Sequence, residues 1–235
     1  MLRLIVDFIT SSIMCPPSAA LAHSTSLDPS SIIPKTPTSK AAYTLASSVL
    51  HPAILNHSIR TYLYASALAV SRGSMYSTDS AKKDLLFTAC IMHDIGTTDT
   101  YNGRHRFEVE GADAASSLLE KFGIGEEERM EVWKAIALHT TVGIVQRMGA
   151  LSALVRQAIE IDFGRTKVVE IADLEVWTTQ VEDAYPRNSI EKVLGDAVVK
   201  QAIANPVKAP PASWPGVMYK AHLEDPTWQG INKAF

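Results

Sequence analysis

The sequence predicts an all-α protein with one helical core. Apolar residues recur at three- and four-residue steps along most of the chain, and no segment shows the two-residue alternation of a half-buried strand. Residues that begin and end helices bracket these stretches, with Ser39 and Pro52 before two of them and Gly73, Gly96 and Gly123 after three. With 46% hydrophobic and 20% charged residues, the 235-residue chain has the size and composition of one large globular domain.

Three parts are expected along the chain. Residues 1–38 form an extended N-terminal arm, residues 39–204 form the helical domain, and residues 205–235 form a proline- and aromatic-rich segment that packs on the core. Because proline removes a backbone donor, regular structure is not expected in either flanking part. The prolines concerned are Pro16, Pro17, Pro29, Pro34 and Pro37 in the arm and Pro206, Pro210, Pro211, Pro215 and Pro226 in the last segment.

The first three helices follow from their start and stop residues. Ser39 is a suitable N-cap for a helix over 40–50. Pro52 suits the first position of a second helix, which Gly73 ends. A third helix is expected over 79–94, and its apolar face consists of Leu85, Leu86, Ala89, Cys90 and Met92.

The later helices are predicted in the same way. A fourth helix over 106–121 stops before Gly123. A fifth over 126–139 begins with three glutamates, which suit the positive end of the helix dipole. The remaining helices are expected over 145–161, 167–177 and 189–204.

Charge and composition exclude several functional classes. The chain has 22 basic and 25 acidic residues, a net charge of −3, so it lacks the basic surplus of a nucleic-acid-binding protein. It has no apolar run of about 18 residues, so no membrane span is expected. Two cysteines, Cys15 and Cys90, are too few for a disulfide framework. Residues 1–22 resemble a weak signal peptide and Met14 offers a second start, but Asp7 interrupts the apolar stretch, so a cytoplasmic location is favoured over secretion.

The candidate chemistry rests on His57, His93, Asp94, His139 and Asp162, each near the middle or end of an expected helix. His93 and Asp94 are adjacent at a helix end, where the helix dipole favours a cation. Together with His57 and Asp162 they supply two imidazoles and two carboxylates, ligands that suit Zn²⁺, Fe²⁺ or Mn²⁺. A surface or structural role is expected for the other histidines, His23, His51, His105 and His222.

The order of these residues resembles the metal motif of the HD-domain superfamily and, more closely, the fungal cyanamide hydratase family. The resemblance covers roughly residues 40–200 and implies an HD-type helical bundle. It also implies one catalytic zinc ion held by His57, His93, Asp94 and Asp162. The stretches that carry it are Leu55-Asn56-His57-Ser58-Ile59-Arg60, His93-Asp94-Ile95-Gly96-Thr97-Thr98-Asp99, Phe107-Glu108, Leu138-His139-Thr140 and Ile161-Asp162-Phe163-Gly164.

The activity that the resemblance implies is hydration of cyanamide, a small neutral nitrile, to urea. A zinc-bound hydroxide would attack the nitrile carbon. Asp94 would accept the proton of the attacking water, and His139 would protonate the nitrile nitrogen. Residues expected to contact the substrate or to support the ligands are Asn56, Thr97, Thr98, Phe107 and Glu108.

Two other functions fit the same residues. An HD-type phosphohydrolase would act on a nucleotide or phosphate ester, and it would need cations such as Arg60 and Arg106 to point into the metal pocket. In a non-catalytic helical binding protein the candidate metal ligands would serve only in packing, and the protein would purify without stoichiometric metal. Aromatic residues of the last segment could pack across a homodimer as readily as within one chain.

Overall fold

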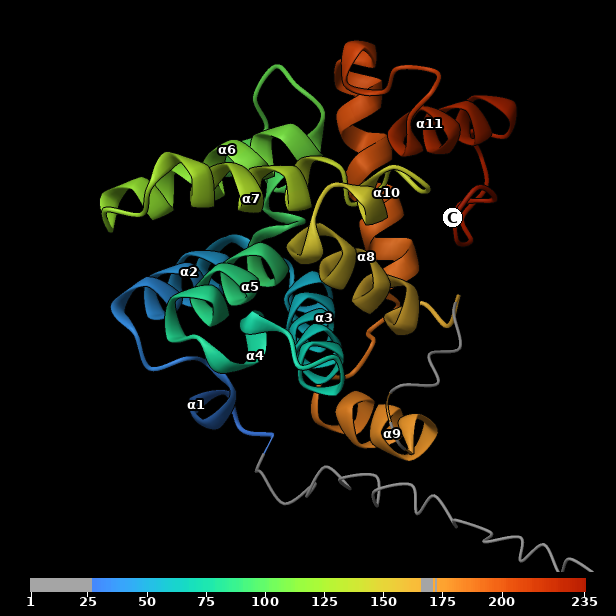
Figure 1. Ribbon diagram of the computed structural model, residues 1–235. Coiled ribbons are helices and arrows are strands. Elements are labelled where there is room, and N and C mark those ends of the chain that lie inside the picture. The colour runs from blue at the N-terminus through green and yellow to red at the C-terminus, as the bar shows by residue number, and fades with distance from the viewer. Residues whose placement is uncertain (1–26, 166–170, 172) are drawn as a thin grey trace, which may run out of the picture.

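The computed structural model describes residues 27–165, 171 and 173–235, and this part of the chain is helical and contains no strand (Figure 1). The prediction of an all-α fold is confirmed. The α-helices are α1 (Pro29–Ile32), α2 (Pro37–Val49), α3 (Pro52–Ser71), α4 (Met75–Thr78), α5 (Ser80–Met92), α6 (Phe107–Lys121), α7 (Glu126–Ala137), α8 (Ala150–Asp162), α9 (Leu174–Ala184), α10 (Ile190–Ala204) and α11 (Trp214–Glu224). Short 3₁₀ turns are η1 (Ile95–Thr97), η2 (Asp99–Tyr101), η3 (Val145–Arg147) and η4 (Pro206–Lys208).

Helix α3 lies in the middle of the fold. It packs against α5 and α8, while α6 pairs with α7 and α10 with α11 (Figure 1). Thirteen of its 20 residues are buried, so α3 is covered by neighbours on most of its circumference. The short side chains of Ala65, Ala67 and Ala69 are buried and let neighbouring helices approach α3 closely.

The start of α2 differs from the prediction. The helix begins at Pro37, because the Thr36 side chain accepts a hydrogen bond from the Ser39 backbone nitrogen and Pro37 fits the first turn. Ser39 is therefore not the cap. Its hydroxyl instead donates to Asp84 Oδ1 at 2.6 Å, which ties α2 to α5. Pro52 begins α3 as expected, and Asp79 caps α5 through its contact with the Lys82 nitrogen.

The predicted extended arm is also corrected where the structure describes it. Pro29 lies in the first turn of α1, and Asp28 caps this short helix by accepting from the Ser30 nitrogen at 2.8 Å. The prolines here begin helices rather than preventing them, since the first turn needs no backbone donor. The signal-like stretch and Met14 lie outside the described residues.

The helix expected over 145–161 is interrupted at its beginning. Val145–Arg147 form the turn η3, and Gly149 adopts φ 122°, a backbone conformation open to glycine, before α8 starts at Ala150. Part of the helix expected over 167–177 lies outside the described residues, at 166–170 and 172, and in the described part α9 begins at Leu174 and continues to Ala184. Helix α4 had not been predicted.

The last segment contains a helix that the prolines were expected to prevent. Pro215 lies in the first turn of α11, and Ser213 caps this helix by accepting from the Gly216 nitrogen at 3.1 Å. Trp214 and Phe235 of the same segment pack against the core. No helix of the described residues is both long and apolar enough to span a bilayer.

Substitution of Gly96 by alanine is expected to destabilise the fold strongly. An added Cβ would lie 2.0 Å from the Phe107 carbonyl oxygen and 2.9 Å from the Gly111 nitrogen, both backbone atoms of α6. Relieving these contacts must move α6 away from η1, which we expect to lower the free energy of unfolding by about 3 kcal/mol. Denaturant titration measures the change. The matched control is Gly125→Ala, whose added Cβ meets only a Glu128 carboxylate oxygen at 4.0 Å and should cost less than about 1 kcal/mol. Equal stability of the two variants would contradict this packing.

Candidate metal centre

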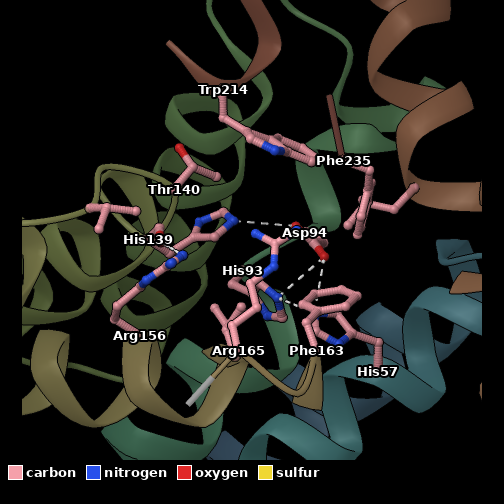
Figure 2. Close-up of a pocket in the computed structure, with 13 residues that line it drawn as sticks. His57, His93, Asp94, His139, Thr140, Arg156, Phe163, Arg165, Trp214 and Phe235 are labelled. Atoms are coloured by element: carbon pink, nitrogen blue, oxygen red, sulfur yellow. Dashed lines mark hydrogen bonds and ion pairs between the residues drawn. The ribbon is translucent and has the colours of Figure 1, made fainter. Parts of the chain in front are cut away.

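The candidate metal donors come from the central helix α3 and from the junction after α5. His57 lies on α3, and His93 and Asp94 follow the last residue of α5, where the chain passes into η1 (Figure 2). At this junction the adjacent side chains of His93 and Asp94 approach each other. All three side chains are at most 1% exposed.

The three residues form a compact cluster of donor atoms, each offering one atom that lies within 4.8 Å of the others. His57 Nε2 is 3.1 Å from His93 Nε2 and 3.7 Å from Asp94 Oδ2. His93 Nε2 is 3.2 Å from the same Asp94 oxygen. Two imidazole nitrogens and one carboxylate oxygen therefore converge on one point.

Hydrogen bonds behind the rings orient both imidazoles toward this point. His93 Nδ1 is 2.7 Å from the Cys90 carbonyl oxygen, and His57 Nδ1 is 2.7 Å from Asp162 Oδ2. Because a carbonyl or an ionised carboxylate only accepts, each Nδ1 carries the proton, and a neutral ring keeps its lone pair on Nε2. Two Nε2 lone pairs then face each other at 3.1 Å, an arrangement that a shared cation stabilises.

The electrostatics of the cluster fit a cation as well. Burial raises the pKa of Asp94, but His93 and His139 in their protonated forms outweigh burial and hold the pKa well below its usual value. Burial lowers the pKa of His57, whereas for His93 the nearby Asp94 carboxylate outweighs burial and raises the pKa. Neither oxygen of Asp94 accepts a hydrogen bond of good geometry from the described residues, so a buried carboxylate is left to bind a positive ion.

Asp162, the fourth expected ligand, lies outside the three-donor cluster. Its Oδ2 contacts His57 Nδ1, and Arg60 donates to Oδ1 at 2.6 Å and to Oδ2 at 2.9 Å. Burial raises the pKa of Asp162, but the hydrogen bond from His57 and the Arg60 guanidinium outweigh burial and lower it. In this arrangement Asp162 orients the His57 ring, and its direct binding to metal stays a prediction.

His139 lies next to the cluster on the other side of Asp94. Its Nδ1 is 2.7 Å from the Ile136 carbonyl oxygen, so a neutral ring presents the Nε2 lone pair, which is 3.5 Å from Asp94 Oδ1. The His93 and His139 rings meet edge to face at 5.0 Å between centroids. The predicted proton transfer by His139 stays a prediction, although the nitrogen it needs is directed at Asp94.

A comparison with protein-family models matches residues 54–185 to the HD domain. The match covers more than half of the chain and includes every candidate donor. The chain belongs to the HD-domain family. A comparison with curated proteins gives no match. HD domains bind divalent metals and are mostly metal-dependent hydrolases, so the buried His57, His93 and Asp94 cluster is consistent with a metal-dependent enzyme.

Several other residues expected at this HD-domain site lie away from the donors. The Thr97 hydroxyl donates to the Asp94 carbonyl oxygen and the Thr98 hydroxyl to that of Ile95, so both support the turn after α5. They border a second groove rather than the metal cavity. Asn56 donates to the Pro186 carbonyl oxygen at 2.9 Å.

Glu108 and Phe107 support the His139 side of the HD-domain site. The fully buried Glu108 accepts from Thr140 at 2.7 Å and pairs with Arg106. Phe107 contacts the His139 ring edge to face, with centroids 5.6 Å apart. Both residues therefore hold the segment that carries His139 and Thr140.

A cavity of about 70 Å³ opens over the metal donors of the HD domain (Figure 2). Arg60 and Arg106, the cations considered from the sequence, do not border it, and both are paired with carboxylates. The cavity is also lined by His139, which is a predicted site residue, and by nine described residues that are not: Thr140, Val142, Arg156, Ile159, Phe163, Arg165, Leu194, Trp214 and Phe235. Of these, Thr140 and Phe163 lie within motifs quoted above, and the others carry no local signal in the sequence.

Proposed function

We propose that this HD-domain protein is a metal-dependent hydratase that adds water to the nitrile of cyanamide and forms urea. The observation that carries the proposal is the three-donor cluster on the floor of a cavity of about 70 Å³ with largely apolar and aromatic walls. Sites for drug-sized molecules typically measure about 300–1,000 Å³. A small uncharged substrate therefore suits the cavity better than a nucleotide does.

Zinc is the ion that the resemblance implies, and the imidazole and carboxylate donors equally suit Fe²⁺ or Mn²⁺. A divalent cation held by His57, His93 and Asp94 would supply a water molecule whose pKa is lowered to about 7. Asp162 orients the His57 ring toward the cation, and the Cys90 carbonyl oxygen orients the His93 ring in the same way.

The proton path in the proposed reaction runs through Asp94 and His139. Attack of the water oxygen on the nitrile carbon forms a carbon–oxygen bond, converts the carbon–nitrogen triple bond into a double bond and releases one proton, which Asp94 Oδ1 accepts. His139 Nε2, 3.5 Å away, takes this proton and delivers it to the nitrile nitrogen. The resulting isourea shifts its hydroxyl proton from oxygen to nitrogen and becomes urea.

A phosphate monoester is the second candidate substrate, and one observation favours it. Arg156 and Arg165 border the cavity, and guanidinium groups bind phosphate oxygens well. Arg156 is already bonded to Glu160 at 2.9 Å and to the His139 carbonyl oxygen at 3.1 Å, whereas Arg165 lies over the Phe163 and Phe235 rings. Arg165 is thus the cation that this alternative would use.

A comparison of two substrates distinguishes the candidates. The zinc-loaded protein is incubated with cyanamide or with p-nitrophenyl phosphate, and urea and inorganic phosphate are measured with and without EDTA. We expect urea formation that stops in EDTA and little phosphate release. If the protein releases phosphate but forms no urea, and if Arg165→Gln releases less phosphate than the unchanged protein, the hydratase proposal is overturned in favour of the phosphohydrolase.

A further inference from the structure

One wall of the metal cavity is built by residues outside the HD-domain match. Leu194 of α10, Trp214 of α11 and Phe235 all border the cavity, and all follow residue 185, where the match ends. Figure 2 shows Trp214 and Phe235 close together on one side of the metal donors, with His57 on the other. The family match therefore covers the metal donors but not this wall of the cavity.

The aromatic rings of this wall are fixed by edge-to-face contacts. Phe235 lies 5.6 Å from Trp214 and 5.2 Å from Phe163 between ring centroids, and Trp214 lies 6.1 Å from Phe107. The Arg165 guanidinium lies over both phenylalanines, 5.7 Å from the Phe163 centroid and 5.6 Å from that of Phe235. A substituent that needs the space filled by this wall would have to break several of these contacts together.

The backbone around the wall is anchored as well. An added Cβ on Gly195 of α10 would lie 2.9 Å from Met218 Cε and 3.6 Å from Phe235 Cδ2, so glycine allows the last segment to lie against this helix. Asn232 donates to the Met218 carbonyl oxygen at 3.0 Å and thereby ties this segment to α11. The Phe235 ring is thus held in place from α10, α11 and the segment after α8.

We propose that Trp214 and Phe235 set the upper size limit of the substrate. They are specificity-determining residues that admit a nitrile with a small substituent, such as an amino or methyl group, and exclude one with an aromatic ring. The proposal deepens the proposed function and rests on it for the reacting group. The size limit itself rests only on the cavity and its aromatic wall.

The test is binding and turnover of benzonitrile by the full-length chain. We expect no detectable binding of benzonitrile to the unchanged protein by ligand-observed NMR. We expect clear binding to Phe235→Ala and Trp214→Ala, because truncating either half-buried ring of the wall leaves apolar space beside the cavity for a benzene-sized ligand. The ratio of kcat/KM for benzonitrile to that for cyanamide should rise about tenfold or more in both variants.

Trp228→Ala is the matched control. Trp228 belongs to the same segment but is 51% exposed and does not border the cavity. We expect this variant to exclude benzonitrile as the unchanged protein does. Circular dichroism melts establish that each variant is folded, and Phe235→Leu should give an intermediate affinity.

Two results would overturn the size limit: benzonitrile bound equally by the unchanged protein and by Phe235→Ala, or bound by neither truncated variant. If no form of the protein hydrates any nitrile, the proposed function fails, and the binding measurement still decides whether the wall excludes large ligands.

Discussion

Substitution of Asp94 by asparagine is expected to abolish both metal binding and urea formation. The variant keeps the shape of the side chain but removes the one negative charge among the three clustered donors. In the variant a neutral amide lies beside the His57 and His93 nitrogens. Its NH₂ group could donate a hydrogen bond to one of them and so occupy the place of the cation. We expect the rate of urea formation to fall by about a thousandfold or more, since metal catalysis contributes several kcal/mol. Metal analysis of the purified variant, together with the urea assay, measures both effects.

Asp99→Asn is the matched control for this variant. It makes the same chemical change five residues away, at a side chain that is 86% exposed and paired only weakly with Lys200 at 3.4 Å. Metal content and activity of the control should match those of the unchanged protein. Asp94→Ala should be as inactive as Asp94→Asn, and both should melt cooperatively in chelator. Metal content and turnover retained in a folded Asp94 variant would refute the assignment.

Loss of the Arg60 side chain is expected to cause the largest loss of stability. The side chain is fully buried, forms two hydrogen bonds with Asp162 and donates to the Tyr185 carbonyl oxygen at 2.9 Å. Arg60→Met fills similar space but removes the guanidinium that is hydrogen-bonded to both oxygens of a buried carboxylate and leaves only the Arg187 guanidinium, at 3.9 Å, among the described residues, which costs about 3–5 kcal/mol. For a chain of this size the cost corresponds to a fall of roughly 6–20 °C in Tm. Calorimetry in the presence of chelator measures the change.

The destabilisation should depend on pH in a definite direction. Because the pKa of Asp162 is lowered in the folded state from its ordinary 3.8, its contribution is present above that value and is lost as the pH falls toward the folded pKa. The difference in unfolding free energy between the unchanged protein and Arg60→Met should therefore be greatest near neutrality and shrink below about pH 4. A difference that stays constant from neutral to acid pH would show that packing, rather than charge, accounts for the loss.

The control for this pair is Arg72→Met, just beyond the end of the same helix. Arg72 forms an exposed hydrogen bond with Gln157 at 2.6 Å. Its loss should change the unfolding free energy by less than about 1 kcal/mol and show no corresponding dependence on pH. Equal losses from Arg60→Met and Arg72→Met would contradict the account of the buried pair.

Local signals in the sequence predicted the helices well because each depends on neighbouring residues. Pro52 begins α3 and the glutamates begin α7 as expected. The errors occur where one residue type has two uses. In the two flanking parts the prolines predict a lack of regular structure, yet Pro37 and Pro215 lie in first turns, where the capping side chains of Thr36 and Ser213 make helices possible.

The candidate site could be predicted only in part, because its residues depend on contacts that are distant in sequence. His57, His93 and Asp94 were identifiable from motifs, and they come together in the fold. The pairing of Arg60 with Asp162 spans 102 positions, and no local pattern indicates that an arginine would occupy both oxygens of an expected ligand. Trp214 and Phe235 likewise reach the cavity from beyond the HD-domain match, and only the aromatic character of the last segment predicted that it would pack on the core.

The most direct measurement is urea formation from cyanamide as metal-free protein is titrated with Zn²⁺. We expect activity to be absent in chelator, to rise in proportion to added zinc and to level off when each chain has bound a single ion. The His57, His93 and Asp94 cluster would then account for the catalytic metal. A folded, zinc-loaded protein that forms no urea, or urea formation that chelation leaves unchanged, would contradict the account.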